Sequence, residues 1–223
     1  MVGKNLLVAI IDGGITSGLF SIDALKFDVY VTRFRLVCNK SIIQTSASLH
    51  GSVVAGIIKK YAPKADICSI QIFKDSTMRT SCRMLVSAMK WCLKMNIPII
   101  NLSLGTIDPD DFKIVNKITD KLLENGQIIV AACKRDGSYG LPAMHPGVIG
   151  VRIDTKLSGN AFLAVNNGGG INYAASSIHE LDWPYGGKYI TPISNSYAAP
   201  TITAAVINGQ IGTNPHCRVI KSM

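Results

Sequence analysis

Three polar residues of this chain have types that could together activate a serine for nucleophilic attack. Ser196 stands in a Ser/Asn turn ahead of small residues, Pro200 and an apolar segment, a pattern typical of a tight turn that enters a buried helix. Asp12 follows the apolar run Leu6 to Ile11, and His50 opens a segment with an apolar helical face. A histidine can take the proton of a serine hydroxyl, an aspartate can orient that histidine, and a backbone N–H at a helix start can stabilise an oxyanion.

Each of these residues also has an ordinary structural interpretation. Ser196 could cap its helix, Asp12 could cap the turn after a strand, and His50 could be a helix-start histidine whose polar atoms are satisfied locally. The order along the chain favours the chemical interpretation, because Asp, His and Ser follow one another as one known arrangement of such residues does.

The elements that must position these residues alternate between buried strands and amphipathic helices. This alternation indicates an α/β fold with three layers and a mainly parallel central sheet, in which chemistry gathers at the carboxyl ends of the strands. The length of 223 residues indicates a single domain over residues 1–223. The predicted strands cover residues 6–11, 27–34, 66–73, 97–104, 127–133 and 148–151, and the predicted helices begin at residues 50, 81 and 110 and at Ser196.

The composition argues against several classes of protein. The hydrophobic fraction is 48% and the charged fraction 17%, which suits a buried core rather than a disordered chain. Lys and Arg outnumber Asp and Glu by 23 to 14, which favours an acidic partner, but no motif supports nucleic-acid binding. No apolar run is long enough to span a membrane, and no signal peptide precedes the first strand. We therefore expect a cytoplasmic protein with reduced thiols and no membrane partner.

No pattern in the sequence predicts a metal site or a cofactor. The six cysteines include no CxxC pair, no acidic loop suits calcium, and no GxGxxG follows the first strand. Cys133, next to Lys134 and Arg135, is either a thiol with a lowered pKa or a small buried residue at the end of a strand. The other histidines lack a comparable context and are interpreted as surface or loop residues: His145, His179 and His216.

Five segments of the chain, in order, resemble the subtilisin-like serine peptidases (subtilases). Val8 to Ile15 (VAIIDGGI) resembles their Asp segment, and His50 to Ile58 (HGSVVAGII) resembles their His segment. Ile100 to Gly105 (INLSLG) resembles the strand that binds substrate backbone, and Ile128 to Gly137 (IIVAACKRDG) resembles the strand leading to the oxyanion residue. Ser194 to Ala205 (SNSYAAPTITAA) resembles the segment that carries the nucleophile.

The resemblance implies a role for each site residue. Ser196 would attack the peptide carbonyl, His50 would take and return the proton, and Asp12 would orient His50. An extended peptide would pair as an added strand with three residues, so that its binding is largely backbone-directed: Ser103, Leu104 and Gly105.

The chain departs from the family where the oxyanion is stabilised. Subtilases usually have Gly-Asn at the positions that Lys134 and Arg135 occupy here. Arg135 either donates to the oxyanion or points elsewhere, and Asn195 is a candidate substitute donor. Ser194 and Asn195 replace the usual Gly-Thr before the nucleophile, and Gly13 replaces a small hydroxyl residue.

These observations predict a serine endopeptidase, a compact intracellular form without a prodomain, that processes a peptide or protein substrate, for example by removing a leader. The positive charge beside the site favours an acidic peptide, and a partner protein is compatible with the sequence. The alternative is a pseudoenzyme with the subtilase fold, which binds peptide or protein without cleaving it because the oxyanion Asn is replaced. A nucleotide-binding protein would rest on fold class alone.

Overall fold

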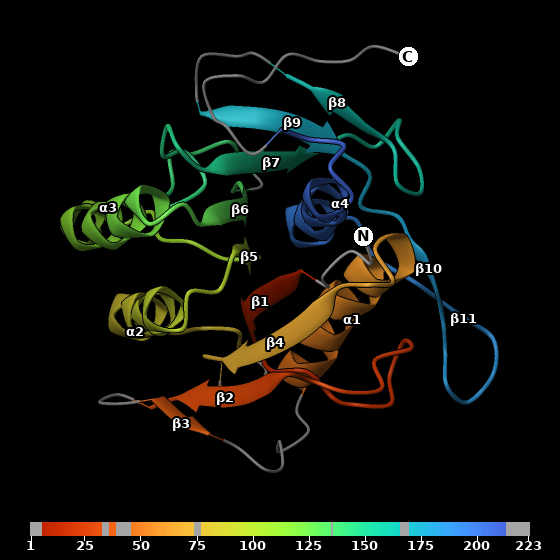
Figure 1. Cartoon of the computed structure of the whole chain (residues 1–223). Coiled ribbons are helices and arrows are strands. Elements are labelled where there is room, and N and C mark those ends of the chain that lie inside the picture. The colour runs from red at the N-terminus through yellow and green to blue at the C-terminus, as the bar shows by residue number, and fades with distance from the viewer. Residues whose placement is uncertain are drawn as a thin grey trace.

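A mainly parallel sheet forms the centre of the molecule (Figure 1). The computed structural model describes residues 6–32, 36–38, 46–73, 77–134, 136–165 and 170–212. The strands of the sheet are β1 (Leu7–Asp12), β2 (Phe27–Val31), β3 (Leu36–Cys38), β4 (Asp66–Gln71), β5 (Ile99–Leu102), β6 (Ile128–Ala132), β7 (Ile149–Ile153), β8 (Phe162–Ala164) and β9 (Ile171–Ala175). Within the described ranges they lie in the order β3-β2-β4-β1-β5-β6-β7-β9-β8, and only the edge strands β3 and β8 run antiparallel to their neighbours.

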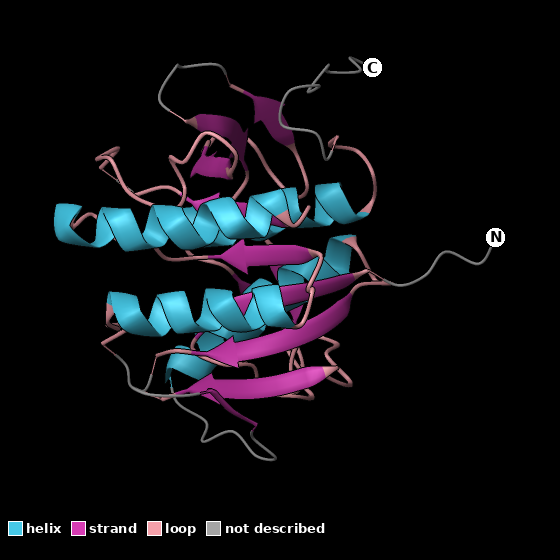
Figure 2. Ribbon diagram, turned by 60° about the vertical axis from the view of Figure 1, so that its left-hand side comes forward, coloured by secondary structure: helices cyan, strands magenta, loops and turns pink. Residues whose placement is uncertain are grey.

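Helices cover both faces of the sheet and complete three layers. They are α1 (Ser46–Tyr61), α2 (Cys82–Lys94), α3 (Pro109–Glu124) and α4 (Asn195–Ile207). α1 and α4 lie on one face, and α2 and α3 lie on the other (Figure 1). Figure 2 shows the second pair side by side in front of the sheet. A separate antiparallel hairpin joins β10 (Glu180–Asp182) to β11 (Lys188–Ile190). The predicted three-layer α/β fold with a mainly parallel central sheet is confirmed.

Burial explains why the segments take these conformations. β1 is buried from Val8 to Asp12 and β5 along its whole length, as expected for strands covered by helices on both faces. α2 and α3 bury one stripe each and expose the rest. α4 is buried on nearly all sides, and Ser196 is a half-buried exception at its start. In the described part of the chain, no helix combines the length and the apolar character needed to cross a membrane.

Two helix boundaries differ from the prediction in ways that affect the site. α1 begins at Ser46, so His50 lies in its second turn rather than at its start. α4 begins at Asn195, one residue before the predicted start, with Ser194 as its N-cap and Pro200 inside the helix. The side chain of Ser194 accepts a hydrogen bond from the N–H of Ser196, which sets the start of α4 early.

Candidate active site

α1 approaches the end of β1 so closely that only glycine fits at the contact. A Cβ on Gly13 would overlap the backbone oxygen of Ala47, and a Cβ on Gly51 would overlap a backbone oxygen of the turn that follows β1. This close approach brings His50, in the second turn of α1, against Asp12 at the end of β1. The absence of a side chain at Gly13 is therefore part of what positions the two residues.

Asp12 and His50 form a hydrogen-bonded pair beside a cleft. Nδ1 of His50 lies 2.8 Å from Oδ1 and 3.0 Å from Oδ2 of Asp12. Asp12 is fully buried, and its Oδ1 also accepts a hydrogen bond from the N–H of Gly13 at 2.6 Å. Because a carboxylate can only accept, the pair holds a proton on Nδ1 of His50 and leaves Nε2 able to receive one.

The electrostatics of the pair favour a basic imidazole. Burial by itself lowers the pKa of His50, but the charge of Asp12 and the hydrogen bond to it outweigh burial. The pKa of His50 is therefore raised above its ordinary value of 6.5. A raised pKa makes the neutral imidazole a stronger acceptor for a hydroxyl proton, at a pH where the neutral form is populated.

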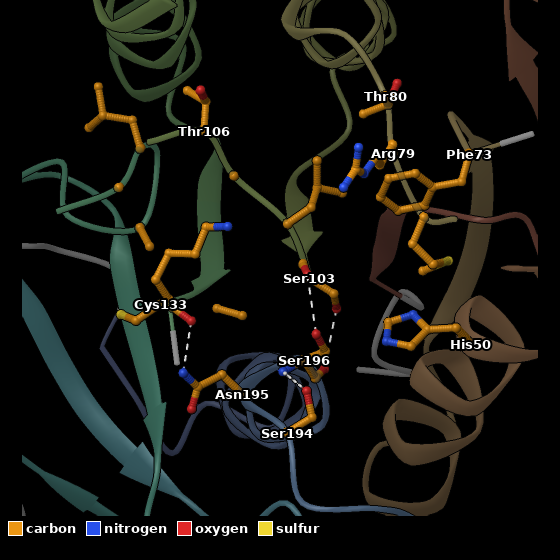
Figure 3. Close-up of a pocket in the computed structure, with 18 of the residues that line it drawn as sticks. His50, Phe73, Arg79, Thr80, Ser103, Thr106, Cys133, Ser194, Asn195 and Ser196 are labelled. Atoms are coloured by element: carbon orange, nitrogen blue, oxygen red, sulfur yellow. Dashed lines mark hydrogen bonds between the residues drawn. The ribbon is translucent and has the colours of Figure 1, made fainter. Parts of the chain in front are cut away.

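Ser196 lies in the first turn of α4 and lines the same cleft as His50 (Figure 3). Its hydroxyl donates a hydrogen bond to the backbone oxygen of Ser103 at 3.3 Å. In this arrangement the hydroxyl is directed at Ser103 rather than at His50. Proton transfer from Ser196 to Nε2 of His50 would therefore require the serine side chain to rotate away from Ser103.

A chain of hydrogen bonds ties α4 to β5 behind Ser196. Thr203 Oγ1 donates to Asn101 Oδ1 at 2.8 Å, and Asn101 Nδ2 donates to Ser103 Oγ at 3.4 Å. Ser103 Oγ in turn donates to the backbone oxygen of Ser196 at 3.2 Å. That oxygen is available because Pro200, four residues further on, has no N–H to bond it. Sequence reasoning missed the positioning residues Asn101 and Thr203, although a lone Asn in an apolar strand was a signal.

The cleft has a volume of about 700 Å³ and lies at the carboxyl ends of β5 and β6. Most of the predicted site residues line it, namely His50, Ser103, Leu104, Gly105 and Ser196. Figure 3 places Cys133 and Arg79 on opposite sides of the pair formed by Ser103 and Ser196. A cleft of this size can accept several side chains of an extended peptide.

The residues predicted near the oxyanion differ in where the structure places them. Arg135 lies outside the described residues, so its role stays a prediction. Lys134 is exposed and lines the cleft. The suggestion that Asn195 substitutes as a donor is wrong, because its buried amide is turned toward the sheet (Figure 3). Its Nδ2 donates to the backbone oxygen of Cys133 at 2.8 Å, and its Oδ1 accepts from the N–H of Ile153 at 2.7 Å.

Burial decides between the two interpretations of Cys133. The residue is buried just after β6, and burial raises the pKa of its thiol to about 11. A thiol with a raised pKa holds little thiolate near neutral pH, so the interpretation as a reactive cysteine is wrong. Cys133 is a small buried residue whose backbone oxygen anchors the amide of Asn195.

His179 lies in the loop between β9 and β10, as one of the two interpretations had it, but it is not at the surface. His179 is buried, its Nε2 donates to the backbone oxygen of Tyr197 at 2.9 Å, and its Nδ1 lies 3.1 Å from the hydroxyl of Tyr61. Burial lowers the pKa of His179 to about 4, so the ring is neutral and links α1 to α4. His145 is half-buried and pairs with Asp120 at 3.0 Å, and His216 lies outside the described residues.

Known proteins resemble this chain both in sequence and in fold. A family model described as the Subtilase family matches residues 3–207. The chain belongs to the Subtilase family. Subtilisin NAT from Bacillus subtilis subsp. natto is 25% identical to this subtilase over 219 residues, which cover 91% of this chain and 55% of that protein. The chain thus spans about half the length of that curated relative.

Two solved structures have the same fold as this subtilase. The prenylagaramide maturation protease PagA superposes with a TM-score of 0.65 at 21% identity, over 94% of this chain and 79% of that one. The nisin leader peptidase NisP from Lactococcus lactis superposes with a TM-score of 0.66 at 15% identity, over 96% of this chain and 80% of that one.

Proposed function

We propose that this subtilase is a serine endopeptidase that cleaves a peptide or protein substrate through Asp12, His50 and Ser196. The observation that carries the proposal is the pair of buried Asp12 and half-buried His50, hydrogen-bonded at 2.8 Å, beside a cleft that Ser196 also lines. The position of this cleft, at the carboxyl ends of parallel strands, is where such folds bind their ligands.

The chemistry follows from the roles that these residues can take. Ser196 Oγ forms a bond to the substrate carbonyl carbon while its proton passes to Nε2 of His50, and the carbonyl electron pair moves onto oxygen. Collapse of this intermediate breaks the C–N bond, and His50 returns the proton to the leaving amine. Water then hydrolyses the acyl-enzyme with His50 again as base. A substrate N–H bonded to the backbone oxygen of Ser103 would displace the Ser196 hydroxyl and so start the sequence.

The substrate we propose is a precursor peptide from which a leader is removed. PagA is a maturation protease and NisP a leader peptidase, and both superpose on nearly all of this chain. The open cleft beside Ser103, Leu104 and Gly105 supports the same proposal, because an extended leader can be held there through its backbone.

The charge of the cleft supports an acidic substrate. Lys134 and Arg79 both line the cleft, and no Asp or Glu lies among its described lining residues. Exposed ion pairs contribute only about 0.2–1 kcal/mol each. We therefore expect a preference of roughly 1.4- to fivefold at each of two substrate positions, rather than an absolute requirement.

A pseudoenzyme that binds peptide without cleaving it is the second candidate. Two observations favour it: the amide of Asn195 is bonded to the sheet, and the hydroxyl of Ser196 is bonded to the backbone oxygen of Ser103. Under this alternative the cleft would bind an extended peptide, but Ser196 would not be activated.

Labelling with a fluorophosphonate probe separates the two candidates. The full chain should be labelled at Ser196, and labelling should disappear in Ser196→Ala and His50→Ala variants that keep the wild-type circular dichroism. A folded wild-type protein that is not labelled would overturn the endopeptidase and leave the pseudoenzyme. Binding of a fluorescent acidic peptide to the Ser196→Ala variant then tests the cleft without any cleavage.

The acidic preference has its own test with matched peptides. Pairs of peptides that differ by Glu or Gln at a single position before the scissile bond should show faster cleavage of the Glu peptide at two positions. Lys134→Gln should remove the preference for Glu at one of these positions, and Arg79→Gln should remove it at the other. Lys117→Gln on α3 makes the same change of charge at an exposed site outside the lining of the cleft. A preference that survives both cleft variants, or that Lys117→Gln removes equally, would rule out recognition by Lys134 and Arg79.

A further inference from the structure

At the start of α4, the backbone N–H that would stabilise an oxyanion is already hydrogen-bonded within the protein. The backbone N–H of Ser196, which should point at the oxyanion, donates instead to Oγ of Ser194 at 3.3 Å (Figure 3). Ser194 is half-buried and lines the cleft beside Ser196. Its hydroxyl therefore occupies the N–H of Ser196 at the edge of the cleft that a substrate carbonyl would enter.

The hydroxyl of Ser194 still has a proton to donate. A serine hydroxyl carries one donor and two acceptor sites, and the contact with Ser196 uses an acceptor site. No acceptor for the Ser194 hydroxyl proton is found in the part of the chain that the structure describes. The neighbouring candidate donor is already committed, because the amide of Asn195 is bonded to Cys133 and Ile153.

We propose that the hydroxyl of Ser194 is the side-chain oxyanion donor of this subtilase. The proposal rests on the proposed endopeptidase function. Ser194 Oγ accepts from the N–H of Ser196 and donates its own proton to the substrate carbonyl oxygen as negative charge develops there. No proton is transferred in this contact, since the proton of Ser196 goes to His50 and the charge stays on the carbonyl oxygen until the C–N bond breaks.

The position of Ser194 gives this donor more strength than an isolated hydroxyl has. An N–H that donates to a hydroxyl polarises it, so the outward O–H becomes a better donor. The N-terminal end of the α4 dipole adds positive potential at the same point, where an anion is stabilised. The N–H of Ser196 thus stabilises the oxyanion indirectly, by polarising the Ser194 hydroxyl that donates to it.

The competing explanation is that Ser194 serves only as the N-cap of α4. Glycine is nearly as good an N-cap as serine, within a few tenths of a kcal/mol, but it has no hydroxyl to donate. Ser194→Gly also restores the residue that subtilases usually have at this position. Threonine keeps both the cap and the hydroxyl. The two substitutions therefore separate donation from capping.

The experiment measures the second-order rate of fluorophosphonate labelling for the full chain and for Ser194→Gly, Ser194→Thr and Arg135→Gln, together with the Tm of each. We expect Ser194→Gly to slow labelling about 100-fold, since loss of one oxyanion donor costs roughly 10²–10³-fold in subtilisin. Ser194→Thr should keep a rate within about tenfold of wild type, and the Tm of both variants should stay close to that of wild type. With a cleavable peptide, the loss should fall on kcat rather than on KM.

Other outcomes would overturn the proposal. If Ser194→Gly is labelled as fast as wild type or faster, Ser194 is only a cap that occupies the N–H of Ser196. If Arg135→Gln abolishes labelling while Ser194→Gly does not, Arg135 is the donor. Either result leaves the endopeptidase standing. A folded wild-type protein that is not labelled at all overturns both the endopeptidase and the role of Ser194.

Discussion

Replacing Asp12 with Asn tests the site most directly, because it changes charge and proton position while preserving shape. Oδ1 of Asp12 accepts from both Gly13 and His50, and Oδ2 lies 3.0 Å from Nδ1 of His50. In Asp12→Asn the amide oxygen can keep the first position, but an NH₂ group then stands where Oδ2 was. That group favours the tautomer in which Nδ1 accepts and Nε2 carries the proton, so the base is lost.

The size of the expected fall in rate follows from the loss of both the required His50 tautomer and the charge of Asp12. The equivalent substitution in a serine protease lowers kcat by about 10⁴-fold, and we expect a loss of 10³–10⁴-fold in the rate of fluorophosphonate labelling at pH 8. The charge of Asp12 also opposes the effect of burial on the pKa of His50. Without that charge burial dominates, so the pKa of His50 should fall below 6.5 and the residual labelling should reach its plateau at lower pH.

The assay is the labelling rate between pH 5 and 9, for wild type and for Asp12→Asn. In wild type the rate should rise with pH through a midpoint above 6.5, because the base must be neutral and its pKa is raised. Asp120→Asn is the matched control, since it alters a second Asp–His pair, with His145, whose carboxylate is more exposed than that of Asp12. A labelling rate in Asp12→Asn within tenfold of wild type, or an unchanged midpoint, would refute the reasoning.

Three further predictions concern packing and protonation. Gly13→Ser restores the family's usual residue type, but it should lower the Tm because its side chain would overlap Ala47. Such a misfit typically costs about 1–3 kcal/mol of folding free energy. An unchanged Tm would show that α1 has room to move. Between pH 6.5 and about 4 the unfolded chain binds a proton that buried His179 does not, so stability falls as the pH is lowered through this range. His179→Gln should lessen that fall in urea unfolding at pH 7 and 5, and an equal fall in both proteins would contradict the assignment. Cys133 should resist iodoacetamide at pH 7.5 in the folded protein, because its pKa is about 11, and rapid alkylation seen by mass spectrometry would disagree.

The sheet could be predicted from the sequence because its strands are buried on both faces. A strand such as β5 needs a continuous apolar run, and such runs are visible in the sequence at nearly their true length. Asp12, His50 and Ser196 could be selected as candidates because each stands next to a recognisable element and because their order along the chain matches a known arrangement. The prediction was less accurate at the start of α1, where the chain becomes helical four residues before His50, within a small polar segment that has no clear apolar period.

The sequence by itself determined the α/β architecture, the three candidate catalytic residues and one part of the cleft wall, Ser103 to Gly105. The tertiary structure alone decided where the polar side chains around these residues point. Asn195 could have faced the cleft, but the free backbone groups of Cys133 and Ile153 draw its amide to the sheet. His179 has no distinctive sequence context, yet the packing of α1 against α4 buries it. Hydrogen bonds between distant segments depend on which donors and acceptors the fold brings together, and local sequence carries no record of that pairing.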